Sequence, residues 1–341
     1  MGAEKKWLFT LFTAAFLSLM IILSSFTSLT SPKPFPSIVN HGFLYPPSFA
    51  YFITGSRGDK DRAFRLLLAI YHPRNRYLLH LGKDAGDEER RRLAAAVMSV
   101  PAMQAFGNVD VVGKADYVTL LGSSNIAITL RAAAIMMKLD SGWDWFVTLS
   151  ALDYPLITQD DLSHVFSSVR RDLNFIDHTS DLGSKESERI QPIVVDPAIY
   201  LSRRSQIFQA THKRKTPESF KIFTGKSTLS YSMEPRILNI SVYNKMVESG
   251  AAFARQFRAN DPVLDMIDEK ILHRRHNRAI PGAWCSGPKG WWRDPCSQWS
   301  NVNVLRPGPQ AKKLEESVSE LLDNWNLQTN QCHTATEETQ E

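Results

Sequence analysis

The sequence predicts an α/β domain with a parallel-rich central sheet and flanking helices, preceded by one N-terminal transmembrane helix. Three observations support this. Apolar strand-like runs alternate with helical patterns from residue 49 to residue 149, residues 7–26 form a nearly uncharged apolar run, and the stretch between them is rich in Ser, Thr and Pro. Strands that alternate with helices are typical of parallel sheets joined by crossover helices.

The composition is that of a globular protein. The 341 residues include 43% hydrophobic and 22% charged residues, which excludes a fibrous or wholly disordered chain. The net charge is +5, and the Lys and Arg residues are dispersed rather than gathered in a nucleic-acid-binding stripe. This slight basic excess suits an anionic ligand, although ordinary surface charge explains it equally well.

The N-terminal region predicts a type II membrane topology. Residues 7–26 are long enough to span a bilayer, and Lys5 and Lys6 before them orient the short tail to the cytosol. A cleaved signal peptide is the alternative, but the apolar run is too long and has no evident cleavage site. The resulting organisation is a cytosolic tail (1–6), a signal anchor (7–26), a stem (27–47), a folded domain (48–327) and a disordered tail (328–341).

The elements of the domain follow from hydrophobic periodicity. Strands are predicted at Phe49–Thr54, Tyr77–Leu81, Val109–Val112 and Trp145–Leu149, and helices at 59–71, 87–98, 124–138, 160–169 and 311–325. In the third helix one apolar stripe is interpreted as core packing: Ile126, Leu130, Ala133, Ala134 and Met137. Asp160 and Asp161 stand in a first helical turn, so we interpret them as capping groups rather than catalysts.

Two features fit the lumen of the secretory pathway. Asn239-Ile240-Ser241 is an N-glycosylation sequon. Cys285 and Cys296 flank a short Gly/Pro/Trp-rich loop and are the expected disulfide, which leaves Cys332 without an evident partner. No Cys/His spacing typical of a metal site is present, so no structural zinc is expected.

A set of motifs in the order of a known family extends over nearly all of the chain beyond the stem. It comprises Ala50–Gly55, Trp143–Phe146, Asp153–Leu156, Asp172–Asp181, Phe220–Gly225, Phe253–Phe257 and Gly308–Leu314. With these motifs the sequence resembles the core-2/I-branching glycosyltransferases, glycosyltransferase family 14, and most of all their plant β-glucuronosyltransferase branch. The motifs are specific as a set, although none would suffice alone.

The resemblance implies an inverting transferase of GT-A-type fold in the Golgi membrane, with its catalytic domain in the lumen. It implies that glucuronic acid passes from UDP-glucuronic acid to β-galactan of arabinogalactan proteins, without a metal or other cofactor. Expected partners are therefore the UDP-sugar, a glycan acceptor on a glycoprotein, the membrane, and a second copy or a related transferase. A β-1,6-N-acetylglucosaminyltransferase activity is the alternative, because both activities share this scaffold.

Candidate donor-binding residues lie where strands end and helices begin. Thr54 and Gly55 end the first strand in a turn that opens a helix, a place that favours phosphate, although a simple tight turn is an equal alternative. Asp153 follows the fourth strand, where many nucleotide-sugar transferases have an Asp-x-Asp pair for a metal. With one aspartate, the leaving-group charge would be neutralised by Lys or Arg, and Asp153 is otherwise a turn residue.

Basic residues supply the remaining candidates. Arg306, Lys312 and Lys313 flank a helix start in a family-like motif and are assigned to the UDP phosphates, with a helix-surface role as the alternative. Lys185 and Arg189 lie four apart and form an acceptor or anion clamp if their segment is helical, although solvated surface is the simpler interpretation.

The chain departs from its family after Gly225. The resemblance implies a following segment that carries the catalytic base as a glutamate in a Glu-x-Tyr/Phe-Phe motif, but Lys226–Pro235 already resembles a later part of the family. Several dozen residues are missing at the 225–226 junction, and Glu218, Glu234 and Glu248 match no such motif. The catalytic residue is therefore unassigned, and a catalytically inactive, shortened form is a further alternative.

Overall fold

The computed structural model describes residues 37–118, 123–175, 194–196, 208–209, 237–288 and 294–328, together with six positions between residues 13 and 20. The chain divides into two units, Met1–Pro36 and Ser37–Glu341. In the first unit the six described positions are helical, and most of the predicted anchor, 7–26, lies outside the described residues. Within the described part of the chain, no helix is both long enough and apolar enough to cross a membrane.

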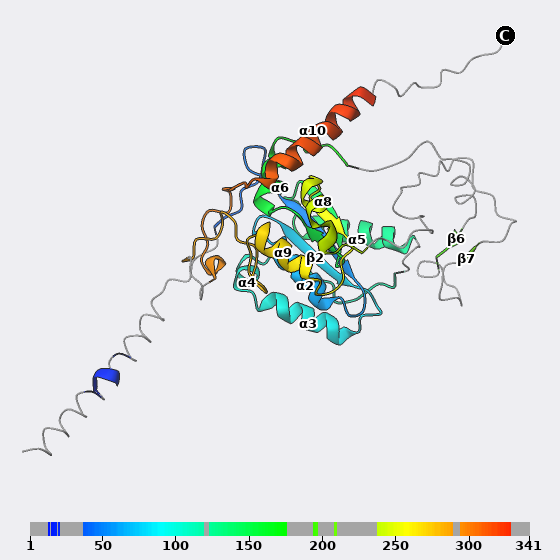
Figure 1. Cartoon of the computed structure of the whole chain (residues 1–341). Coiled ribbons are helices and arrows are strands. Elements are labelled where there is room, and N and C mark those ends of the chain that lie inside the picture. The colour runs from blue at the N-terminus through cyan, green and yellow to red at the C-terminus, as the bar shows by residue number, and fades with distance from the viewer. Residues whose placement is uncertain are drawn as a thin grey trace, which may run out of the picture. The chain divides into compact units, whose positions relative to one another are not determined.

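Among the described residues of the second unit, four parallel strands form the central sheet, in the order β3-β2-β1-β4 (Figure 1). They are β1 (Phe49–Gly55), β2 (Arg76–Leu81), β3 (Val109–Val111) and β4 (Trp145–Ser150). The four predicted strands are confirmed to within a residue or two. In register, Tyr51 of β1 lies between Tyr77 of β2 and Val147 of β4, so β1 is an interior strand.

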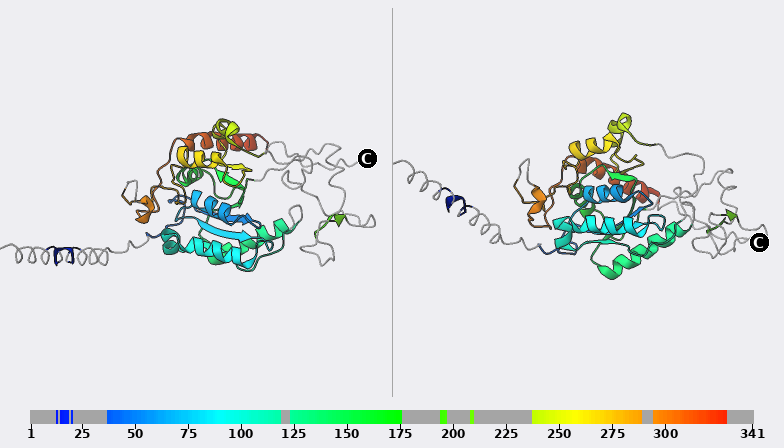
Figure 2. Two further views of the ribbon diagram at one scale, coloured as in Figure 1. Left: turned by 60° about the horizontal axis from the view of Figure 1, so that its bottom comes forward. Right: turned by 90° about the horizontal axis from the view of Figure 1, so that it is seen from below.

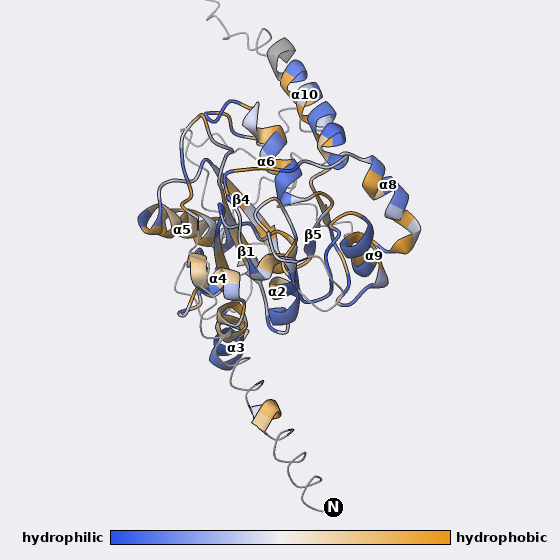
Figure 3. Cartoon of the chain, turned by 90° about the vertical axis from the view of Figure 1, so that its left-hand side faces the viewer, coloured by the Kyte–Doolittle hydropathy of each residue, from blue (hydrophilic) through white to orange (hydrophobic). Residues whose placement is uncertain are grey.

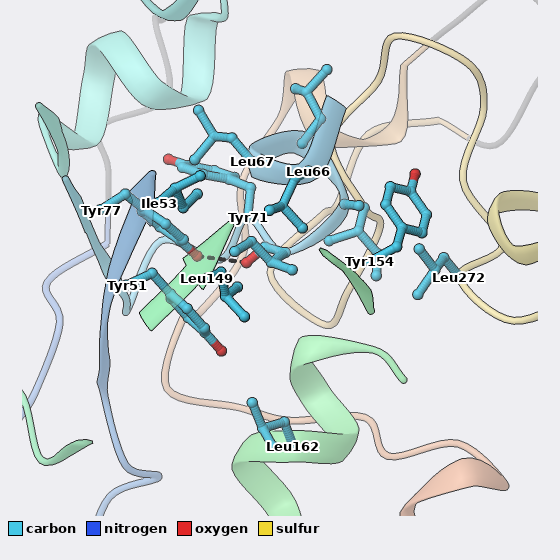
Figure 4. Close-up of a cluster of buried hydrophobic side chains, with 14 of the residues drawn as sticks. Tyr51, Ile53, Leu66, Leu67, Tyr71, Tyr77, Leu149, Tyr154, Leu162 and Leu272 are labelled. Carbon is cyan, nitrogen blue, oxygen red and sulfur yellow. Dashed lines mark hydrogen bonds between the residues drawn. The ribbon is translucent and has the colours of Figure 1, made fainter. Parts of the chain in front are cut away.

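Both faces of β1 are buried from Phe49 to Ile53, which is why hydrophobic residues occupy all five of these positions. Phe49, Tyr51 and Ile53 face the larger core, which contains Leu66 and Leu67 of α2 (Lys60–Ala69). Figure 4 shows Tyr51 and Tyr77 beside these side chains, and their rings stack at 5.4 Å between centroids. The alternate residues, Ala50 and Phe52, face the smaller core under α5 (Ser124–Leu139).

The predicted core stripe of α5 was wrong. Ile126, Leu130 and Met137 are 56%, 66% and 60% exposed, whereas the buried residues are Ser124, Ile128, Ala132 and Met136. The helix has apolar residues on two opposite faces, so its periodicity alone does not say which face is buried. Contact with Ala50, Phe52 and Leu78 of the sheet decides it in favour of Ile128 and Met136.

The other early helices agree with the predictions. They are α3 (Asp87–Met98) and α6 (Gln159–Ser167), while the short α4 (Pro101–Phe106) was not predicted. Asp161 is confirmed as a cap, because it forms a capping box with Thr158. Asp160 instead holds later parts of the chain, because its Oδ2 accepts hydrogen bonds from the backbone N–H groups of Ala283 and Arg306.

The described residues of the later part of the chain add short strands and further helices. β5 (Asp153–Pro155) pairs with β8 (Phe253–Arg255), and β6 (Val194–Val195) pairs with β7 (Phe208–Gln209), both antiparallel. The helices are η1 (Ile240–Val242), α8 (Tyr243–Glu248), α9 (Pro262–Lys270) and α10 (Gln310–Gln328), with a further 3₁₀ turn, η2 (Pro295–Ser297). α9 and α10 lie on the opposite side of the unit from α5 (Figure 2), and α10 carries hydrophobic and hydrophilic residues side by side (Figure 3).

A buried polar network ties the part after the 225–226 junction to the part before it. The carboxylate of Asp268 in α9 accepts from Tyr154 Oη and Arg274 Nε at 2.5 Å each, and from Arg65 Nη2 of α2 at 2.7 Å. Asp268 and Arg274 are 4% and 5% exposed. Since α9 also contributes Val263 and Ile267 to the larger core, both parts of the chain share one interior.

The loop before α10 contains the predicted disulfide, and the Cys285–Cys296 bond is confirmed. Trp284 beside it is fully buried, and Trp299 packs edge-on against Phe106 at 5.2 Å between ring centroids. Both tryptophans therefore pack against the core, while Trp291 and Trp292 lie outside the described residues.

Candidate functional site at the carboxyl edge of the sheet

The carboxyl ends of β1, β2 and β4 lie side by side, because Gly55 pairs with Leu81 and Thr54 pairs with Ser150. This is the edge at which open α/β sheets bind ligands. A larger residue than glycine would be crowded at position 55, because a Cβ there would lie 3.0 Å from both Asp59 Cβ and Leu81 Cδ2. A backbone hydrogen bond also links the ends of β1 and β2 at this edge, since Gly82 N donates to Gly55 O at 2.8 Å.

The turn after β1 runs from Ser56 to Asp59 and leads directly into α2. Asp59 N donates to Ser56 O at 3.1 Å, and Gly58 has a φ of +86°, which a type II turn requires at its third position. Glycine adopts that φ without steric cost. The sequence therefore places the first turn of α2 at the carboxyl edge of the sheet.

The backbone N–H groups of this turn already donate hydrogen bonds to carboxylates. Arg57 N donates to Asp84 Oδ2 at 2.9 Å, while Gly58 N and Lys60 N donate to Glu89 Oε1 at 2.9 and 3.2 Å. These are the amides that would hold a phosphate at a helix N-terminus. A phosphate bound here would have to displace both carboxylates, so the turn is less suited to phosphate than the sequence indicates.

A cavity of about 510 Å³ opens beside the turn, between the first turns of α2 and α3. Its volume falls within the usual range for small-ligand sites. Its charged lining residues have both signs: Arg57, Lys60 and Arg92 against Asp61, Asp84, Glu88 and Glu89. Lys60 pairs with Asp61 and Arg92 pairs with Glu88, which leaves Asp84 and Glu89 as the carboxylates that bind backbone amides. Carboxylate oxygens of this kind accept hydrogen bonds from hydroxyl and N–H groups of a ligand.

Asp153 lies at the same edge, as the first residue of β5. Its Oδ2 accepts from Ser150 N at 2.7 Å, and its Oδ1 lies 3.5 Å from Arg255 Nε. Burial raises the pKa of Asp153, and the Ser150 amide and the Arg255 charge partly oppose that rise. The side chain of Arg255 is 61% exposed, so its guanidinium faces solvent with capacity to bind an anion.

Sequence reasoning missed Arg255. It belongs to a quoted family motif, but no role was given to it, because its position depends on the register of β5 and β8, in which Asp153 faces Arg255. That pairing joins residues about one hundred positions apart. No local pattern in the sequence signals it.

The other predicted phosphate ligands lie elsewhere. Arg306 N and Gly308 N donate to Asp160 Oδ2 and Asp161 Oδ1, which fixes them at the first turn of α6. That turn belongs to the opposite edge of the sheet. Gln159, the first residue of α6, accepts from Asn75 Nδ2, and Asn75 in turn accepts from the first N–H of β1. A strand of seven residues separates the two edges by about 20 Å.

Lys312 and Lys313 follow at the start of α10. Lys312 is 82% exposed and lies 4.0 Å from Glu316, whereas Lys313 Nζ donates to Val247 O at 3.2 Å. The structure thus brings Thr54, Gly55 and Asp153 together and does not bring Arg306 to them. Lys185 and Arg189 lie outside the described residues.

Neither a metal site nor a catalytic base is assigned. In the described ranges no three His, Cys, Asp or Glu side chains are placed to hold a metal ion, and metal independence stays a prediction. Glu218 and Glu234 lie outside those ranges, and Glu248 is the exposed last residue of α8.

Comparison with known proteins gives a consistent result. The family model described as Core-2/I-Branching enzyme matches residues 49–234, more than half of the chain. Beta-glucuronosyltransferase GlcAT14A of Arabidopsis thaliana is 35% identical over 418 residues, covering 97% of this chain and 94% of the relative. GlcAT14B of the same plant is 37% identical, covering 83% of this chain and 80% of the relative. Xylosyltransferase 1 of Canis lupus familiaris is 33% identical over 33% of this chain and 11% of its own length.

The alignment with GlcAT14A also bears on the predicted internal shortening. It extends over 418 residues, whereas the chain has 341, so at least 77 aligned positions have no counterpart here. The length of the alignment does not place these positions along the chain, so the expected loss at the 225–226 junction stays a prediction.

Proposed function

We propose that this chain, a glycosyltransferase of the Core-2/I-branching enzyme family, transfers glucuronic acid from UDP-glucuronic acid to β-galactan of arabinogalactan proteins. The observation that carries this proposal is the 35–37% identity to two named beta-glucuronosyltransferases over 94% and 80% of their lengths. The similarity to xylosyltransferase 1 is confined to a third of the chain and supports only the scaffold.

The residues at the carboxyl edge of the sheet suggest where each part of the donor would bind. Asp84 and Glu89 are hydrogen-bond acceptors, so the ribose hydroxyls or the uracil N–H of the donor suit their side of the cavity. The diphosphate suits the exposed Arg255 guanidinium, which lies next to Asp153 at the same edge of the sheet but does not line that cavity. This arrangement would use Arg255 in the role that the sequence gave to Arg306, Lys312 and Lys313.

The reaction itself makes two demands on the protein. In an inverting transfer, a base removes the proton of the acceptor hydroxyl while that oxygen attacks the sugar carbon and UDP leaves on the opposite side. Positive charge near the diphosphate stabilises the leaving group without a metal. Arg255 would meet the second demand. No carboxylate among the described residues is assigned to the first.

The same proposal includes a Golgi location with residues 7–26 as the signal anchor. It is supported by the apolar run, the preceding lysines and the Cys285–Cys296 disulfide, since disulfides persist in oxidising compartments. The acceptor glycan would then meet the catalytic domain in the lumen.

A second candidate function, an inactive family member that binds UDP without transferring sugar, is favoured by one observation. The alignment excess of at least 77 residues is consistent with loss of the segment that would carry the base. General-base catalysis contributes about 10²–10⁴-fold to rate, so such a loss would leave little turnover.

One assay separates these functions. The full chain and a version restored across the Gly225–Lys226 junction are incubated with UDP-glucuronic acid and β-galactan in the presence of EDTA, and UDP release is measured. UDP-N-acetylglucosamine serves as the control donor. Turnover by both chains with UDP-glucuronic acid supports the transferase, turnover by the restored chain alone supports the inactive form, and preference for UDP-N-acetylglucosamine refutes the donor assignment.

A further inference from the structure

An apolar turn projects from the start of the folded unit. Tyr45 N donates to Gly42 O at 3.1 Å, and Gly42 has a φ of +110°, so residues 42–45 form a tight turn with Phe43 and Leu44 at its apex. These two side chains are 88% and 95% exposed, more than any other large hydrophobic side chain among the described residues. Exposed apolar groups on a fixed turn mark a binding surface for a membrane or another protein.

Arg171 fixes the conformation of this turn. Arg171 Nη2 donates to Tyr45 O at 2.6 Å, and its guanidinium lies 5.2 Å from the centroid of the Phe43 ring. The same guanidinium pairs with Asp144 Oδ1 at 2.8 Å, and the Arg171 side chain is only 12% exposed. Phe43 and Leu44 therefore project into solvent from a turn whose backbone is fixed by Arg171.

The position of the turn in the chain points to a bilayer as its partner. The chain is attached to the folded unit from Ser37 onward: Ser37 Oγ donates to Ser300 O at 2.9 Å, and Asn303 Nδ2 donates to Ile38 O at 3.0 Å. The apolar run of the sequence ends at Phe26, which leaves residues 27–36 as the tether. Ten residues span at most about 35 Å when fully extended.

We propose that the turn 42–45 inserts Phe43 and Leu44 into the interfacial layer of the bilayer in which residues 7–26 are anchored. The inference rests on the proposed membrane anchorage and adds a second contact to it. A tether of ten residues would limit the start of the folded unit to within about 35 Å of the lumenal leaflet. The exposed Ile38, 80% accessible, adds apolar surface beside the attachment point. Interfacial anchors of this kind bury apolar side chains about 5–10 Å into the boundary of headgroups and acyl chains.

The chemistry of the turn predicts hydrophobic rather than electrostatic attachment. Arg171 is already paired with Asp144, and the neighbouring Arg170 is paired with Asp172 at 2.5 Å. Neither cation is available to attract anionic lipids without losing its partner. Insertion should therefore proceed in neutral phosphatidylcholine and change little with salt.

The test uses the full chain in phosphatidylcholine nanodiscs. In a Cys332→Ser background, Leu44→Cys is labelled with an environment-sensitive fluorophore, and Met98→Cys on α3, 57% exposed, is the matched control. The expected result is a blue-shifted emission and quenching by spin-labelled lipid at position 44 but not at position 98, with little change when salt is raised. Equal emission and quenching at the two positions would overturn the inference.

A separate measurement distinguishes failure of this inference from failure of the anchorage. If the chain resists alkaline extraction from membranes but position 44 is not quenched, the anchor stands and the inserted turn is refuted. If alkaline extraction releases the chain, both are refuted. Fluorophore shielding at position 44 without lipid quenching, accompanied by dimers in sedimentation, would assign the turn to contact between copies and overturn the bilayer as its partner.

Discussion

The Nε atom of Arg255 lies 3.5 Å from Oδ1 of Asp153, which joins the end of the first half of the domain to a strand from the second half. This pair gives the carboxyl edge a buried negative group and an exposed positive one. The exposed Arg255 guanidinium is therefore our candidate for binding an anion at this edge.

Arg255→Gln should weaken UDP binding by about 10- to 100-fold, because a charge-assisted hydrogen bond contributes roughly 1.5–3 kcal/mol. Isothermal titration of the full chain with UDP measures the change. Arg170→Gln, which removes an exposed arginine paired with Asp172, is the control and should bind like the unmodified chain. Equal affinity in all three chains would remove Arg255 from the donor site.

The buried His72 should make the fold sensitive to acid. Burial, followed by the nearby Arg74 charge, lowers the pKa of His72 to about 3, whereas its ordinary value is 6.5. Between those values the unfolded chain binds a proton that the folded chain does not, so stability is fully present above pH 6.5 and falls as the pH is lowered. The slope from this one group is at most about 1.4 kcal/mol per pH unit.

Urea unfolding at a series of pH values tests this. His72→Gln should flatten the dependence between pH 6.5 and 4, whereas His164→Gln, which changes an exposed histidine on α6, should leave it as it is. An unchanged slope in the His72 variant would show that other groups cause the acid sensitivity.

Asp268 should be far more important to stability than its neighbour Asp265, although both accept a hydrogen bond from Arg65 at 2.7 Å. Asp268→Asn leaves the buried Arg274 without its carboxylate and should cost about 3–5 kcal/mol. Asp265 is 65% exposed, so Asp265→Asn should cost less than about 1 kcal/mol. The free energies of unfolding in urea decide the matter, and similar losses would contradict a stabilising role for the buried network.

Asn239 should carry an N-linked glycan when the chain is made in plant cells. The residue is exposed, and its Oδ1 accepts from Ser241 N at 3.0 Å at the start of η1. Treatment with a deglycosylating enzyme should increase gel mobility, and Asn239→Gln should migrate like the treated chain. No mobility difference would count against exposure of this domain to the lumen.

Local sequence patterns were sufficient wherever the chain's neighbours in space are also its neighbours in sequence. The bounds of the individual strands, the helices α3 and α10, the Asp161 cap and the Cys285–Cys296 bond were all predicted, because period, capping chemistry and short spacing act over a few residues. The family followed from the order of the motifs.

Tertiary structure alone decided the rest. The buried face of α5 was set by its contact with Phe52 and Leu78, since the helix has two apolar faces and only packing chooses between them. Arg306 and Thr54 were expected at one ligand but are fixed near opposite edges of the sheet, because Asp160 at the start of α6 holds Arg306. Arg255 reaches Asp153 through strand pairing over a long sequence separation, and such pairings arise from the free energy of the whole folded chain rather than from any local pattern.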